Sequence, residues 1–129
     1  MAATPAPEQL SLSLPAATQH LASVRAFVGE AWHGLGFDDE ATDDARVVAS
    51  EALAELLAKR GSGLATISIA VDVRTVSATI RLRPDADAPA VHVTDDDRRA
   101  SLIVALMPAV RMQVDATPAS ITFEVPRPA

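Results

Sequence analysis

Two neighbouring stretches of the chain alternate apolar and polar residues with a period of two, and this pattern restricts the fold more than any other feature. The apolar positions are Ile67, Ile69, Val71 and Val73 in the first stretch and Val76, Ala78, Ile80 and Leu82 in the second. Because only Arg74 and Thr75 separate them, the pattern predicts a β-hairpin with one buried face. Both strands should therefore lie in one sheet.

Two helical segments precede this hairpin. The apolar residues Leu21, Val24, Val28, Ala31 and Leu35 fall at steps of three and four, which predicts a helix from about residue 16 to the glycines at 34 and 36. A second helix is predicted over residues 41–59, preceded by acids that suit a helix N-terminus. Its apolar arc comprises Ala45, Val48, Ala49, Ala52, Leu53 and Leu56, and the glycines at 61 and 63 end it.

The rest of the chain supplies further short elements. Leu10, Leu12 and Leu14 alternate in a first strand that Pro15 should end, and a loop over residues 84–97, with a short strand at 91–93, leads to a third helix. Thr94 and Asp97 have capping-box spacing at its start, its core stripe is Leu102, Ile103, Leu106 and Met107, and Pro108 stops it. Met112 and Val114, with Ile121, Phe123 and Val125, predict a final hairpin.

This order of elements predicts an α+β fold, a two-layer sandwich with a mostly antiparallel sheet and three helices on one face. At 129 residues, the length fits one domain over residues 9–129 after a disordered lead-in at residues 1–8.

The composition narrows the classes of partner and compartment. A net charge of −6 and an aromatic fraction of 3% argue against nucleic acid, which needs clustered cations and aromatic rings for stacking. The chain has no cysteine, no secretory signal pattern and no apolar run long enough to span a membrane. A cytoplasmic protein that binds other proteins is the expectation.

Three acids gather on one side of the second predicted helix. Asp44, Glu51 and Glu55 lie within about 40° of one another on a helical wheel, at the margin of the apolar arc. Lys59 has the spacing to pair with Glu55. The acids fit either a solvated helix edge with one Glu–Lys pair or a carboxylate pair at a cation or base site.

The segment Asp43-Asp44-Ala45-Arg46-Val47-Val48-Ala49-Ser50-Glu51-Ala52-Leu53 resembles the Bergerat-fold ATPases, and specifically the anti-sigma serine kinases of the RsbW type. The resemblance spans nearly the whole chain and implies a histidine kinase-like ATPase fold. It assigns Glu51 the role of the catalytic Glu that polarises the attacking hydroxyl. In that family an Asn four residues later holds Mg²⁺, whereas this chain has Glu55, whose carboxylate would have to replace the amide.

The family's two glycine boxes are altered here. The box that follows the hairpin reads Asp85-Ala86-Asp87-Ala88-Pro89, in which Asp85 keeps the position that reads adenine but both glycines are gone. The phosphate box at the third helix reads Arg99-Ala100-Ser101-Leu102-Ile103-Val104, so Ser101 is the polar residue left to bind the cofactor. The lid between the boxes has shrunk to about residues 90–98.

Other polar residues give weaker indications of a functional site. The acidic loop contains Asp85, Asp87, Asp95, Asp96 and Asp97, offset by Arg98 and Arg99, and is either a solvated connector or a site for a divalent cation. The spacing of His20, His33 and His92 is not that of metal ligands, and Ser50 lies on a helix with no nearby histidine, so these residues are expected to be structural or exposed.

The resemblance therefore implies a regulatory protein of anti-sigma type that binds a sigma factor or an anti-sigma antagonist, without ATP hydrolysis. In the family the first strand and first helix form a homodimer whose joint surface holds the sigma factor, which corresponds to residues 10–32 here. The alternative is an active serine/threonine kinase that uses ATP and Mg²⁺ and phosphorylates the antagonist. A structural dimerisation module unrelated to sigma factors is the third possibility.

Overall fold

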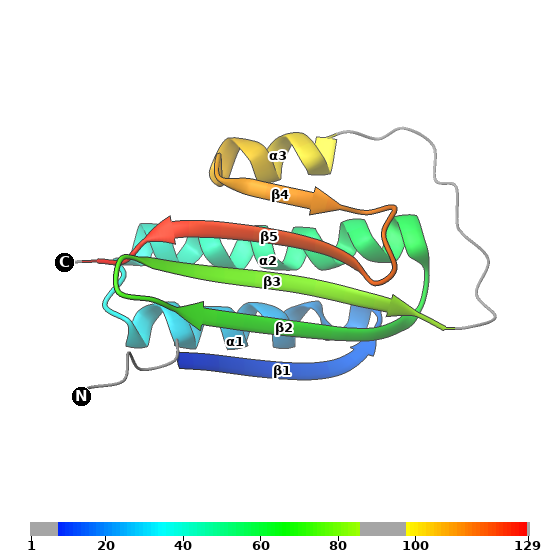
Figure 1. Ribbon diagram of the computed structural model, residues 1–129, viewed down its shortest axis with the longest axis horizontal. Helices are drawn as coiled ribbons and strands as arrows, with labels where there is room; N and C mark the ends of the chain where they lie inside the picture. The colour runs from blue at the N-terminus through cyan, green and yellow to red at the C-terminus, as the bar shows by residue number, and fades with distance from the viewer. Residues whose placement is uncertain (1–7, 86–97, 129) are drawn as a thin grey trace, which may run out of the picture.

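A computed structural model describes residues 8–85 and 98–128 (Figure 1). The elements in these ranges are β1 (Glu8–Ala16), the short 3-10 helix η1 (Thr18–His20), α1 (Leu21–Gly34), α2 (Asp39–Arg60), β2 (Gly63–Val71), β3 (Thr75–Pro84), α3 (Arg98–Leu106), β4 (Val110–Gln113) and β5 (Ala119–Pro126). The strands form an antiparallel sheet in the order β1-β2-β3-β5-β4.

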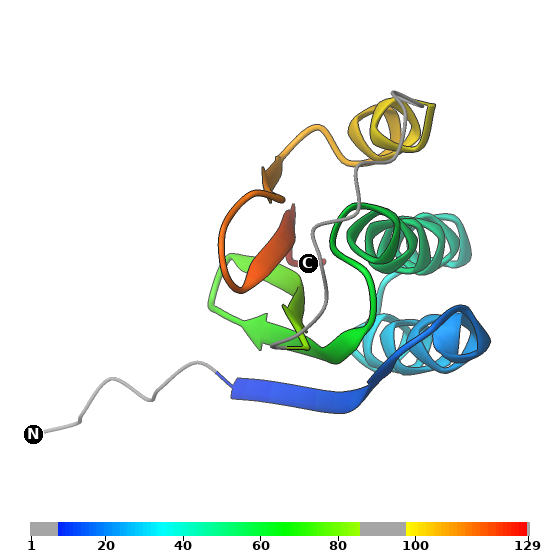
Figure 2. The same ribbon diagram turned by 90° about the vertical axis from the view of Figure 1, so that its right-hand side faces the viewer.

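The sheet and the helices form two layers. Figure 2 shows the three described α-helices side by side on one face of the sheet, with α1 next to β1 and β2, and α3 at the side of β4. The helix α2 lies between α1 and α3 and packs on β3 and β5. This arrangement confirms the predicted α+β fold class. No helix in the described ranges is both long and apolar enough to cross a membrane.

The central hairpin forms with the predicted buried face. Ile67 pairs with Ile80, Ile69 with Ala78 and Val71 with Val76, and the inward side chains of both strands are buried against the helices. The connection spans residues 72–74 rather than the predicted 74–75, because the Asp72 carboxylate accepts the Val73 amide at 2.7 Å and the Asp72 amide donates to the Thr75 carbonyl at 2.8 Å. Val73 was predicted to be buried, but it sits in this turn and is 82% exposed.

The helix α2 is longer than predicted at its N-terminus because of its cap. The Asp38 carboxylate accepts the Ala41 amide at 2.8 Å, so the helix begins at Asp39 rather than Ala41. Gly61, with a φ of 81°, ends the helix and donates its amide to the Leu57 carbonyl. All six residues of the predicted apolar arc are fully buried.

Two other sequence-based expectations are wrong. Pro15 does not end the first strand but lies within β1, where it pairs with Leu64; an edge strand tolerates a residue without an amide donor. Leu102 was assigned to the core stripe of the third helix, but it is 41% exposed because Ile103 and Met107 occupy the buried side of this segment. The predicted capping pair, Thr94 and Asp97, and the short strand at 91–93 lie outside the described residues.

Candidate functional site

Glu51 and Glu55 of α2 face the first turn of α3. The Arg99 Nε donates a hydrogen bond to the Glu51 Oε2 at 3.2 Å, and its Nη1 lies 3.6 Å from the Glu55 Oε2. On the other side of Glu55, the Lys59 Nζ lies 3.8 Å from the Oε1. The predicted pairing of Glu55 with Lys59 is thus present, and a second cation joins it from another helix.

Burial distinguishes the two acids. The Glu51 side chain is 36% exposed and pairs with Arg99 near the surface, whereas the Glu55 side chain is only 6% exposed. Although it faces Arg99, the Glu55 Oε2 lacks a hydrogen-bond partner within the described residues. Among the described residues, two acids and two bases balance the charge of this cluster, so the carboxylates already have the counter-charges that burial requires.

The cluster does not fit a Mg²⁺ site as it stands. Mg²⁺ needs a nearly octahedral shell of oxygen ligands, but the oxygens of Glu51 and Glu55 face a guanidinium and an ammonium group. In the described part of the chain, no group of three or more His, Cys, Asp or Glu residues is placed to hold a metal ion. A cation at Glu55 would have to displace both Arg99 and Lys59.

Asp85 and Ser101, the other two predicted site residues, lie apart from the acid pair. Asp85 follows the end of β3, where its Oδ2 accepts from the Ser62 Oγ at 3.2 Å and its amide donates to the Ser62 carbonyl at 3.2 Å. It therefore ties the end of β3 to the α2–β2 connection. Ser101 is exposed and lines a shallow depression beside Met112 of β4. It lies two positions after Arg99, about 200° around the helix, so Arg99 and Ser101 cannot face the same side.

Several residues of the predicted site fall outside the described residues. They are Asp87, Pro89, Asp95, Asp96 and Asp97 of the acidic loop, the lid residues 90–97, and His92. Within the described part, Ser50 is buried in α2 and donates to the Val47 carbonyl at 3.1 Å, an ordinary back-bond of a helical serine.

Arg99 is the residue that sequence reasoning missed as a partner of the acids. A signal was available, because a basic residue in the first turn of a helix opposes the helix dipole and therefore needs an acid from elsewhere. Glu51 stands 48 positions away from it in the sequence, however, and the spacing alone does not show that the two helices meet.

No protein-family model matches the chain, and no curated protein matches it either. The resemblance to the anti-sigma kinases therefore rests on the sequence motifs quoted above.

Proposed function

We propose that the chain is a regulatory protein of anti-sigma factor type that binds a sigma factor or an anti-sigma antagonist and does not hydrolyse ATP. The observation that carries the proposal is the contact of Arg99 with both Glu51 and Glu55. In an active kinase of the resembled family, the first position polarises the attacking hydroxyl and the second holds Mg²⁺. Here the guanidinium group of the chain itself engages both carboxylates.

The start of α3 supports the absence of ATP chemistry. Phosphate binding at a helix N-terminus needs exposed backbone amides, which glycines leave accessible. The described helix begins Arg98-Arg99-Ala100, and the Arg99 side chain extends toward α2 from this turn. A nucleotide would have to break these ion pairs before its phosphates reached the cluster.

The edge of the sheet supports a protein-binding role. The nine-residue strand β1 pairs with β2 on one side only, so its other edge can accept hydrogen bonds from a second chain. The helix α1 lies beside it (Figures 1 and 2). Arg25, Ala26 and Glu30 of α1 are exposed, and so is Leu10 of β1. We infer that this surface forms a homodimer and contacts the sigma factor or antagonist. We also propose that the protein is cytoplasmic.

The first test is a calorimetric titration with ATP, with and without Mg²⁺, up to millimolar nucleotide. We expect no saturable heat under either condition. Magnesium-dependent binding in the micromolar range would overturn this part of the proposal and favour a serine/threonine kinase in which Glu55 holds the metal. Loss of that binding in Glu51→Ala and Glu55→Ala variants would then locate the site.

The second test addresses the partner surface. The double charge reversal Arg25→Glu with Glu30→Arg should weaken binding to the cognate sigma factor or antagonist at least tenfold in a pull-down followed by calorimetry. The matched control, Arg81→Glu with Glu124→Arg, makes the same charge exchange on the open face of the sheet and should leave binding unchanged. Equal binding of the parent and the α1 variant to every sigma factor and antagonist tried would contradict the proposal.

A further inference from the structure

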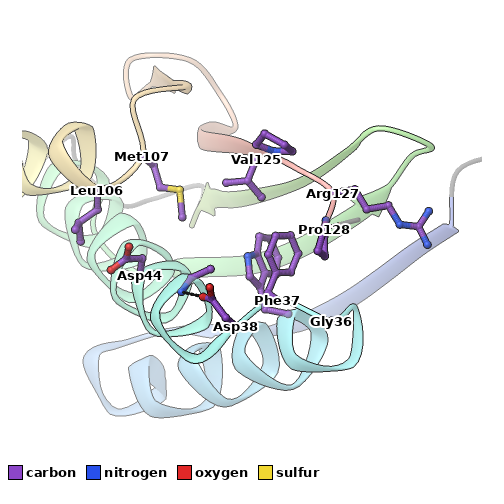
Figure 3. A pocket seen from close by; sticks show the side chains of 12 residues that line it. Gly36, Phe37, Asp38, Asp44, Leu106, Met107, Val125, Arg127 and Pro128 are labelled. Atoms are coloured by element: carbon purple, nitrogen blue, oxygen red, sulfur yellow. Dashed lines mark hydrogen bonds between the residues drawn. The ribbon is translucent and has the colours of Figure 1, made fainter.

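A concave pocket lies between the start of α2, the end of α3 and the end of β5, away from the acid pair. Its volume is about 520 Å³, within the range of pockets that hold small organic ligands. Figure 3 shows apolar side chains, including Leu106, Met107 and Val125, on one side of it and Phe37 and Pro128 on another. These side chains offer enough apolar surface to shield a ligand's single apolar ring from water.

One residue that lines this pocket carries a buried donor without an acceptor. Trp32 lines the pocket and is fully buried, and its Nε1 has no hydrogen-bond partner among the described residues. A buried indole N–H normally finds an acceptor, because leaving it unpaired costs about 1–3 kcal/mol. An oxygen acceptor on a bound molecule would satisfy it.

The charges around the pocket favour a cation. Asp44 is half-buried in the lining, and no ion pair or hydrogen bond is made by its carboxylate within the described ranges. Asp38 adds a second carboxylate, which caps α2. Arg127, the single base among the described lining residues, extends away from the pocket in Figure 3, and its Nη1 donates to the Asp72 carbonyl at 3.3 Å. The pocket also lies at the C-terminal end of α3, where the helix dipole favours positive charge.

We propose that this pocket binds a small amphipathic organic cation, in which an apolar ring lies against Met107 and Val125, a protonated amine pairs with Asp44 and a carbonyl oxygen accepts the Trp32 indole N–H. The site is independent of the proposed anti-sigma function. It takes a ligand class that the acid pair of α2 cannot hold, because that pair is already neutralised.

The chain carries its own reporter for the test. Trp32 is the sole tryptophan, so a ¹⁵N-labelled sample gives one indole N–H signal, from the wall of the pocket itself. Four probes share a phenyl ring and differ in their polar groups: phenylalaninamide has an amine and an amide, phenethylamine only the amine, hydrocinnamamide only the amide, and hydrocinnamate a carboxylate. At about 0.3 kcal/mol per heavy atom, phenylalaninamide should bind with a Kd of about 2 mM.

We expect a saturable shift of the indole signal with phenylalaninamide, weaker shifts with phenethylamine and hydrocinnamamide, and the weakest with hydrocinnamate. Asp44→Asn should weaken phenylalaninamide binding about three- to tenfold and leave hydrocinnamamide unaffected. The matched control is Asp39→Asn, which also removes one negative charge near the N-terminus of α2. Asp39 does not line the pocket. Asp39→Asn should change the affinity for phenylalaninamide only by a small electrostatic effect.

Three outcomes would overturn the proposal. They are the absence of a saturable shift with any of the four probes, tighter binding of hydrocinnamate than of phenylalaninamide, and equal effects of Asp44→Asn and Asp39→Asn on phenylalaninamide. Thermal unfolding of each variant checks that the fold is intact, and both aspartates are accessible enough for the substitution to be tolerated.

Discussion

Glu55 is the buried acid of the described residues, and the basic side chains around it offset the cost of burying its charge. Its side chain lies between Arg99 and Lys59. Removing one partner of a buried ion pair leaves a charge without compensation, whereas replacing both partners with apolar residues is often neutral. The cluster is thus a structural feature of the α2–α3 contact as well as an obstacle to a metal.

We predict that Arg99→Met lowers the free energy of unfolding by about 2 kcal/mol, less than for a fully buried pair because Arg99 is partly exposed and Lys59 remains. Adding Glu55→Leu to Arg99→Met should restore at least half of the loss. Urea unfolding measures both values. Asp43→Asn serves as the control, since it breaks only the exposed pair with Arg46 and should change stability by no more than about 0.5 kcal/mol. A double variant less stable than Arg99→Met would contradict this account.

At the scale of the elements, two glycines that approach neighbours closely should lose different amounts of stability on the same change to alanine. A Cβ at Gly63, the first residue of β2, would meet the backbone of Arg83 and Pro84 across the hairpin. Gly63→Ala should therefore cost about 2 kcal/mol, because the strands must move apart. For a Cβ at Gly29 in α1, the three nearest atoms belong to the guanidinium of Arg46, which can swing into solvent.

Gly29→Ala should accordingly change stability by less than about 1 kcal/mol, since the better helix propensity of alanine offsets the displaced arginine. Thermal unfolding of the two variants side by side checks this pair. A loss at Gly29 as large as at Gly63 would show that Arg46 cannot move and that its position is fixed by the α1–α2 packing.

Local sequence patterns predicted the buried faces of several elements, but not the features that depend on contacts between elements. The alternation in β2 and β3 and the helical spacing in α2 are local patterns, and they predicted the buried faces correctly. Val73 and Leu102 were misplaced because the position of a turn and the rotation of a short helix depend on backbone hydrogen bonds and on packing partners. The spacing of Glu51 and Glu55 indicated a shared helix face. The contact of Arg99 with them could not be predicted in this way, because it depends on the packing of α2 against α3, which are distant in sequence.

For the whole molecule, Trp32 is the residue that joins the two layers. Its ring stacks on Phe37, after α1, with 5.3 Å between centroids, and lies 5.8 Å from the ring of Phe123 in β5. Because the chain has no tyrosine and one tryptophan, its intrinsic emission reports on this junction alone, whereas far-ultraviolet circular dichroism reports on all helices and strands.

We predict that both signals follow the same urea transition, because a core shared by the helices and the sheet unfolds as one cooperative unit. Phe123→Leu should lower the free energy of unfolding by about 1–2 kcal/mol through lost ring contact and move both transitions together. If the emission of Trp32 changed at lower urea than the circular dichroism, the helix layer would separate from the sheet before either melted. In that case the pocket that Trp32 lines would open as a local event, and ligand binding there would stabilise the junction without raising the midpoint of the main transition.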